Sequence, residues 1–143
     1  MGILLTTIIS PITAGPHAAD LNIAVAWAGI LCGVLGGAAQ GLFFHRDDWL
    51  GGYGSWRRRL ARLGHVSFFG IAFLNLAFAV TVAQPGWAPR SAVPGLALAA
   101  AQGLMPLLCF LSAWRRPFRH GFVLPVGCVL VAVVGLIGGR LLA

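Results

Sequence analysis

Three histidines in this sequence share a setting in which metal or haem chemistry could occur. His45 ends one apolar run, His65 begins the next, and His120 immediately precedes another. If these runs are membrane-spanning helices, the three imidazoles lie at one depth, and Asp47 and Asp48 lie beside them. Imidazole nitrogens and carboxylate oxygens suit zinc, iron or copper, and two imidazoles can ligate a haem.

The spacing of these residues nevertheless favours a plainer role. The sequence has neither an HExxH motif nor a pair of histidines four residues apart, and such spacing is what makes a ligand signature specific. The arginines in the same segments would also repel a metal cation. We therefore interpret His45, His65 and His120 first as interfacial residues near lipid headgroups. A haem or pigment contact is kept as the alternative, and no metal site is assigned.

His65 is the best single candidate for a cofactor contact, because it lies within the helical run LGHVSFFG rather than in a loop. Phe68, Phe69 and Ala72 follow it by three, four and seven residues, so they share its helix face. Such a face could line a flat cofactor or pack against a neighbouring helix.

Sequence signatures of catalysis are absent. The chain has no GxSxG motif, no P-loop and no GxGxxG motif. Acid–base catalysis needs positioned titratable groups, and the only carboxylic side chains are Asp20, Asp47 and Asp48. We therefore expect that the protein is not an enzyme.

The elements that must position these residues are transmembrane helices. Of the 143 residues, 59% are hydrophobic and only 9% are charged, whereas a soluble domain carries about 25% charged residues. Four apolar runs are each long enough to cross about 30 Å of hydrocarbon as a helix. We predict an all-α integral membrane protein with four transmembrane helices in a compact antiparallel bundle. The predicted spans cover residues 21–44, 63–84, 92–114 and 121–142.

The first twenty residues are predicted to form a separate N-terminal segment, and residues 21–143 the transmembrane domain. The apolar part of residues 1–20 is too short to span a bilayer, is broken by Pro11 and Pro16, and lacks the basic start of a signal peptide. We expect it to lie in the outer membrane interface or against a partner.

Arginine distribution predicts the orientation. Eight arginines fall in the predicted loops 45–62 and 115–120, whereas only Arg90 and Arg140 lie on the other side. Because positive residues stay cytoplasmic, the two arginine-rich loops should be cytoplasmic and both termini periplasmic, in a bacterial inner membrane. The net charge of +7 does not indicate nucleic-acid binding, because the arginines form short clusters between apolar runs.

Glycines and a few polar residues mark the expected helix-packing surfaces. The first span has glycines every four residues, which predicts a groove about 18 Å long; the third span repeats the pattern. These residues are Gly29, Gly33, Gly37, Gly41, Gly95, Ala99 and Gly103. The stripes could pack inside one bundle or face a partner subunit. Gln40, Asn75 and Gln102 are polar within spans, and we expect Asn75 and Gln102, both about 18 Å deep, to approach one another or share a polar partner.

These features together favour a non-catalytic accessory subunit that packs through its glycine zipper into a larger membrane complex. A bioenergetic complex, respiratory or photosynthetic, is the expected kind of partner, along with membrane lipids. One alternative is a small haem- or metal-binding electron carrier that uses His45, His65 and His120. Another is a small-solute channel or transporter, although no Asp, Glu, Lys or His lies in the central part of any span.

Overall fold

The computed structural model describes residues 16–87 and 91–141, and these residues form helices and turns without any strand. Four helices are long and apolar enough to cross a membrane, which confirms the predicted all-α, multi-pass membrane protein. The long helices are α1 (Pro16–Gly41), α2 (Trp56–Val82), α3 (Val93–Trp114) and α4 (Val123–Leu141). Two short 3-10 helices, η1 (Trp49–Gly51) and η2 (Arg116–Phe122), lie in the connections.

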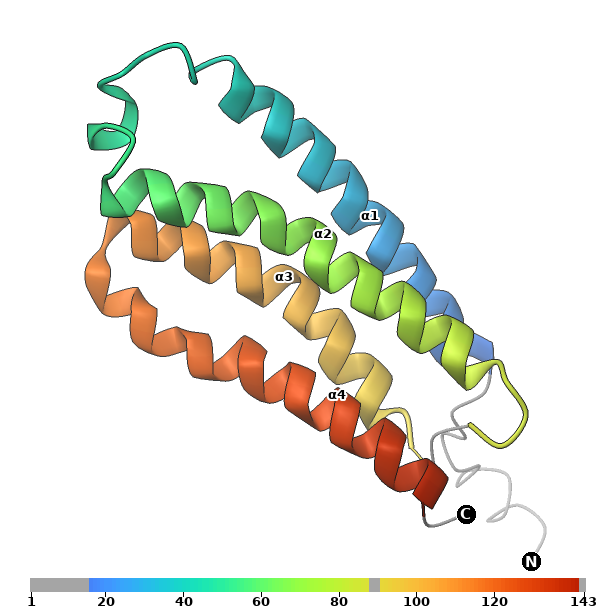
Figure 1. The fold of residues 1–143 in the computed structure, drawn as a ribbon. Coiled ribbons are helices and arrows are strands. Elements are labelled where there is room, and N and C mark those ends of the chain that lie inside the picture. The colour runs from blue at the N-terminus through green and yellow to red at the C-terminus, as the bar shows by residue number, and fades with distance from the viewer. Residues whose placement is uncertain (1–15, 88–90, 142–143) are drawn as a thin grey trace, which may run out of the picture.

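Consecutive helices run in alternating directions, and α3 lies at the centre of the molecule (Figure 1). It contacts α1, α2 and α4, and α1 also contacts α2. In the described part of the chain, α4 contacts only α3 and η2, and no pair of Cα atoms joins it to α1 or α2 within 8 Å. The arrangement is therefore more open than the compact four-helix bundle that the sequence predicted.

The two ends of the molecule differ in chemistry. The α1–α2 connection and η2 lie together at one end (Figure 1), which we call the arginine end. The start of α1, the α2–α3 turn and the end of α4 lie at the opposite end. There the Arg140 guanidinium lies 5.7 Å from the centre of the Trp87 ring, which ties the last turn of α4 to the α2–α3 turn.

Helix α2 begins seven residues before the span that was predicted from residue 63. Ser55 caps it: the Ser55 hydroxyl accepts a hydrogen bond from the Arg58 backbone N–H at 3.1 Å. Arginine is a good helix former, so the run from Arg57 to Arg62 forms the first two turns of α2 rather than part of a loop. The predicted 45–62 loop is wrong in this respect, and the connection covers residues 42–55 only.

The N-terminal segment predicted over residues 1–20 lies mostly outside the described residues. From Pro16 onward the chain is already helical, so its last five residues belong to α1. At the opposite end, side chains from three helices form a small core, in which Phe78, Leu98 and Ala132 are buried. This core joins α2, α3 and α4 although the α2 and α4 backbones are apart.

Candidate functional site

Two asparagines meet in the interior between α1, α2 and α3. The Asn22 amide donates to Asn75 Oδ1 at 2.6 Å and to the Gly95 carbonyl at 3.0 Å. The Asn75 amide donates in turn to the carbonyls of Ile71 and Leu98, at 3.0 and 3.3 Å. Both asparagines are fully buried, so this pair holds the three helices together through hydrogen bonds that no lipid can replace.

Gln102 is also buried, but its partner differs from the predicted one. Its amide donates to the Phe68 carbonyl on α2 at 3.0 Å. Within the described residues, no hydrogen bond links Gln102 to Asn75 or both to a common side chain, so the structure shows no direct pairing of these two buried residues. Asn22 takes that place. Its position seven and eleven residues before Gly29 and Gly33, on the same helix face, was the sequence signal that could have revealed it.

Gln40, the third predicted intramembrane polar residue, is only half-buried. It lies one residue before the end of α1, and its side chain forms no hydrogen bond with the described residues. Its contribution to helix association is therefore smaller than that of the two asparagines.

The glycines of α1 receive large side chains from α2 and α3. A Cβ atom built on Gly29 would clash with Gln102 Nε2, and one on Gly33 would lie 2.7 Å from the Phe69 ring. Gly37 likewise lies against His65, so the first three glycines of the predicted stripe face the interior of the molecule. Gly41 has nothing within 4 Å, and α1 diverges from α2 at this end (Figure 1).

In α3 the predicted stripe likewise leaves the interior. Gly95 is buried against Asn22 and Phe78, Ala99 is half-buried, and Gly103 is exposed with nothing within 4 Å of an added Cβ. At 3.6 residues per turn, each step of four residues rotates by about 40° around the helix. A strict four-residue spacing therefore cannot follow one straight interface.

His65 lies between α1 and α2. Its Cε1 atom would be 2.5 Å from a Cβ on Gly37, and its ring stands edge-on to Phe69 with centroids 5.4 Å apart. Its Nδ1 is buried without a hydrogen-bond partner in the described structure. Gly37 of α1 thus lies directly beside the imidazole. A flat cofactor could reach His65 from this side only if α1 moved away.

The other two histidines do not join His65. His45 is exposed in the α1–α2 connection, and His120 is exposed in η2, where its Nε2 accepts a hydrogen bond from Arg119 Nε at 3.4 Å. Among residues 16–87 and 91–141, no three His, Cys, Asp or Glu side chains come together as a metal ligand set. The shared depth of the histidines therefore does not bring them into one site, because they lie on different elements.

Arg58 is buried, although the sequence placed it only as one of eight arginines in the predicted loops. Its guanidinium donates to the carbonyls of Phe44 and Arg46, at 3.3 and 3.5 Å. The same group lies 5.3–5.5 Å from the ring centres of Phe44, Trp49 and Tyr53. Arg58 therefore holds the α1–α2 connection against α2 through cation–π contacts and hydrogen bonds, and does not extend to lipid headgroups.

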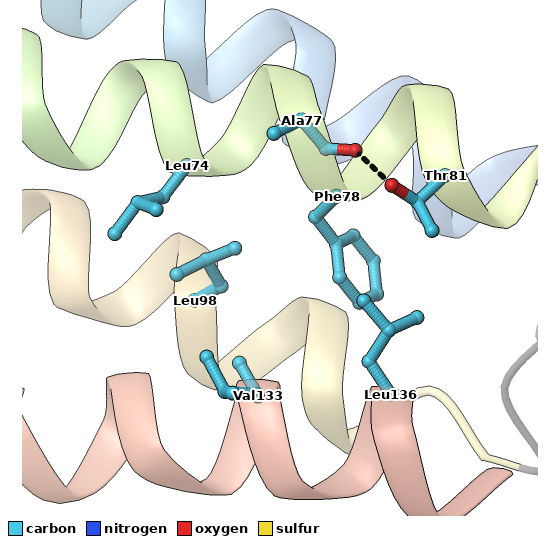
Figure 2. Close-up of a pocket in the computed structure, with 8 residues that line it drawn as sticks. Leu74, Ala77, Phe78, Thr81, Leu98, Val133 and Leu136 are labelled. Atoms are coloured by element: carbon cyan, nitrogen blue, oxygen red, sulfur yellow. Dashed lines mark hydrogen bonds between the residues drawn. The ribbon is translucent and has the colours of Figure 1, made fainter. Parts of the chain in front are cut away.

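Two apolar hollows lie along α2 on the side of η2 and α4. One of about 390 Å³, near the arginine end, is lined by residues of α2, α3 and η2, and one of about 130 Å³ is lined by residues of α2, α3 and α4 (Figure 2). We call the surface that contains both hollows the α2–α4 groove. The α2 residues that line it are Leu63, Ser67, Gly70, Ile71, Leu74, Ala77, Phe78 and Thr81. The remaining lining residues are Leu98, Met105, Phe122, Ala132, Val133 and Leu136.

The groove walls are almost wholly apolar. The Thr81 hydroxyl is satisfied within its own helix, because it donates to the Ala77 carbonyl at 2.7 Å (Figure 2). Phe78 points from α2 toward Leu136 on α4 (Figure 2) and narrows the groove at the opposite end. Such a surface can hold apolar helix or acyl surface and offers no group for acid–base chemistry.

Comparison with known proteins gave no match to a family model, to a curated protein or to a solved structure. The function is therefore inferred from the residues of this chain alone.

Proposed function

We propose that this protein is a non-catalytic accessory subunit of a larger inner-membrane complex. In this proposal it binds a transmembrane helix of a partner subunit in the α2–α4 groove. The observation that carries the proposal is the separation of the helix backbones: in the described structure no Cα atom of α4 lies within 8 Å of a Cα atom of α1 or α2, and α2 meets α4 only through side chains such as Phe78. On this side, α3 is flanked by α2 and α4, and no other described helix covers the surface between them.

The dimensions of the groove support a helix as the occupant. Its α2 wall runs from Leu63 to Thr81, which corresponds to about 27 Å along a helix axis. This length is close to the hydrocarbon thickness of a bilayer, about 30 Å. A partner helix that spans the membrane could therefore contact the groove along most of its length.

Gly70 in the groove would let the backbone of a partner helix come close to α2. Gly70 lies in the wall of the larger hollow, and an added Cβ there would meet nothing within 4 Å. Helices in lipid associate through van der Waals packing, which small residues strengthen because they let backbones come close. Gly70 is thus an open small-residue site, in contrast to Gly29 and Gly33, which internal side chains already cover.

Polar side chains in the spans are used within the molecule. The side chains of Asn22, Asn75 and Gln102 point into the α1–α2–α3 interior and form hydrogen bonds there. They are therefore not presented to the α2–α4 groove, whose contacts with a partner would depend on shape and apolar packing. This favours a permanent structural contact over a transport path through the groove.

Photo-crosslinking in native membranes tests the proposal. A benzophenone amino acid is introduced at Leu63 or Leu74, which line the groove and are 51% and 42% exposed. Matched controls carry it at Leu31 or Leu35 of α1, which are 59% and 61% exposed. We expect protein adducts of higher mass from the groove positions and lipid adducts from the α1 positions.

Adducts confined to lipid at all four positions, together with a protein that purifies alone from native membranes, would contradict the accessory-subunit function. A Soret band in the purified protein that is lost on His65→Ala would favour the haem-carrier hypothesis instead.

A further inference from the structure

A second hollow, separate from the α2–α4 groove, lies at the arginine end between the start of α2 and the end of α3. It encloses about 380 Å³ and is lined by both polar and apolar atoms. Its walls include Leu50, Ser55, Trp56, Arg57, Trp114 and Arg116. Because these residues begin and end apolar spans, the hollow lies where lipid headgroups would be.

The walls of this hollow are held in place before any ligand binds. The Ser55 hydroxyl donates to the Leu50 carbonyl at 2.7 Å, and Leu50 adopts a left-handed conformation (φ 55°, ψ 25°) that is rare for leucine. Across the hollow, the Trp56 indole N–H donates to the Ser112 carbonyl on α3 at 3.2 Å. These bonds fix both the turn and one tryptophan relative to α3.

The guanidinium groups of the two arginines that line the hollow have no partner among the described residues, unlike those of Arg59 and Arg62 on the same helix as Arg57. Arg59 donates to the Gly54 carbonyl at 2.7 Å, and Arg62 donates to the Tyr53 carbonyl at 3.5 Å. Arg57 and Arg116 are exposed, and neither side chain forms a hydrogen bond or ion pair with another described residue. Their donors are therefore available to an external acceptor.

The charge around the hollow favours an anion. The arginine end carries eight arginines and two aspartates, a net charge of +6. Of the two aspartates, Asp48 already lies 3.6 Å from Arg46. An arginine guanidinium matches the geometry of phosphate oxygens, with which it can form two parallel hydrogen bonds.

We propose that this hollow binds the phosphate group of an anionic phospholipid, with Arg57 and Arg116 as its ligands. Trp56 and Trp114 would flank the glycerol region at the membrane interface. Phosphatidylglycerol fits this description. Phosphatidylcholine carries the same phosphate, but its choline cation would lie among the arginines and be repelled. The inference is independent of the proposed subunit function, since the two sites share no residue.

Lipid adducts measured by native mass spectrometry test the proposal. The purified full-length protein in detergent is titrated with phosphatidylglycerol and, separately, with phosphatidylcholine. We expect stronger binding of phosphatidylglycerol, and a loss of about thirtyfold in that binding in the double variant Arg57→Gln/Arg116→Gln. The variant Arg57→Lys/Arg116→Lys keeps the charge but loses the paired hydrogen bonds, so its binding of phosphatidylglycerol should fall between that of the native protein and that of the glutamine variant.

The matched control is Arg115→Gln/Arg119→Gln, which removes the same charge from the same end of the molecule outside the hollow. Equal losses in the two glutamine variants would overturn the site, because they would show a general charge effect. Equal binding of the two lipids by the native protein would overturn it as well. If inorganic phosphate displaced phosphatidylglycerol at equal concentration, the ligand would be free phosphate, and the assignment to a lipid would be wrong.

Discussion

At the scale of single residues, buried polar groups do most of their work inside this molecule. Asn22 and Asn75 join each other and the carbonyls of Gly95, Ile71 and Leu98. In the hydrocarbon region no water can form a hydrogen bond with an unpaired amide, so the loss of either partner lowers the stability of the fold. The two asparagines therefore specify how α1 sits on α2 and α3.

A double-mutant cycle on these asparagines should reveal their coupling. Asn22→Ala, Asn75→Ala and the double variant are unfolded by titration with SDS, and helicity is followed by circular dichroism. We expect an interaction energy of about 0.6–2 kcal/mol, because either single change leaves the other amide with an unpaired group.

Gln40→Ala is the control for this cycle. Its side chain is half-buried and forms no hydrogen bond with the described residues, so the change should be close to neutral. If the two asparagine substitutions were additive within about 0.3 kcal/mol, the pair would not be a stabilising unit.

At the scale of helices, the evenly spaced glycines of α1 lie in two different environments, one covered by side chains and one open. Gly29 and Gly33 lie under Gln102 and Phe69, and Gly37 lies under His65, whereas Gly41 is open. The interior face of α1 follows Asn22, Ala26, Gly29 and Gly33, which are spaced by four, three and four residues. This alternation keeps to one side of a helix better than the strict four-residue repeat does.

Alanine substitution distinguishes covered from open glycines. At Gly33 the new Cβ would be 2.7 Å from two atoms of the Phe69 ring, which cannot rotate away without leaving the interface. We expect Gly33→Ala to lower the free energy of unfolding by about 1–3 kcal/mol, measured by SDS titration.

Gly103→Ala is the matched control within a helix interior, where an added Cβ meets nothing within 4 Å. It should be neutral or slightly stabilising, since alanine favours helix more than glycine does. Equal effects at Gly33 and Gly103 would mean that Phe69 does not pack tightly on α1.

At the scale of the whole molecule, charge is divided between the ends while the sides are apolar. Eight of the ten arginines belong to the arginine end, and several of them are fixed to backbone carbonyls of the α1–α2 connection. On the side, α4 exposes most of its length and its span is the least buried of the four. The charged end would set the orientation in the membrane, and in the proposed function the partner helix would lie beside α4, in the α2–α4 groove.

Cysteine labelling tests the orientation. In a variant with Cys32, Cys109 and Cys128 replaced by alanine, single cysteines are introduced as Gly54→Cys at the arginine end and Ser91→Cys at the opposite end. A membrane-impermeant maleimide should label Ser91→Cys in intact spheroplasts, and Gly54→Cys only after permeabilisation. The reverse pattern would show that the arginine end faces outward.

Much of the fold could be predicted from composition and run length, because the physics is local. The third span was expected over residues 92–114 and is a helix over Val93–Trp114. The start of α2 was missed, because a predicted loop rich in arginine is hard to distinguish from the charged first turns of a capped helix. The candidate site was harder to predict. Asn22 and Arg58 each owe their role to partners on other elements, 53 and 14 residues away along the chain.

The sequence by itself determined that this protein has four apolar helices and one strongly positive end, because hydrocarbon thickness and charge act on each segment separately. Only the tertiary structure decided which face of each helix is used. It separated His45, His65 and His120, covered the first glycines of α1 with side chains, and opened the α2–α4 groove. These outcomes depend on the rotation and tilt of whole helices against one another, and small differences in packing over many contacts set those quantities.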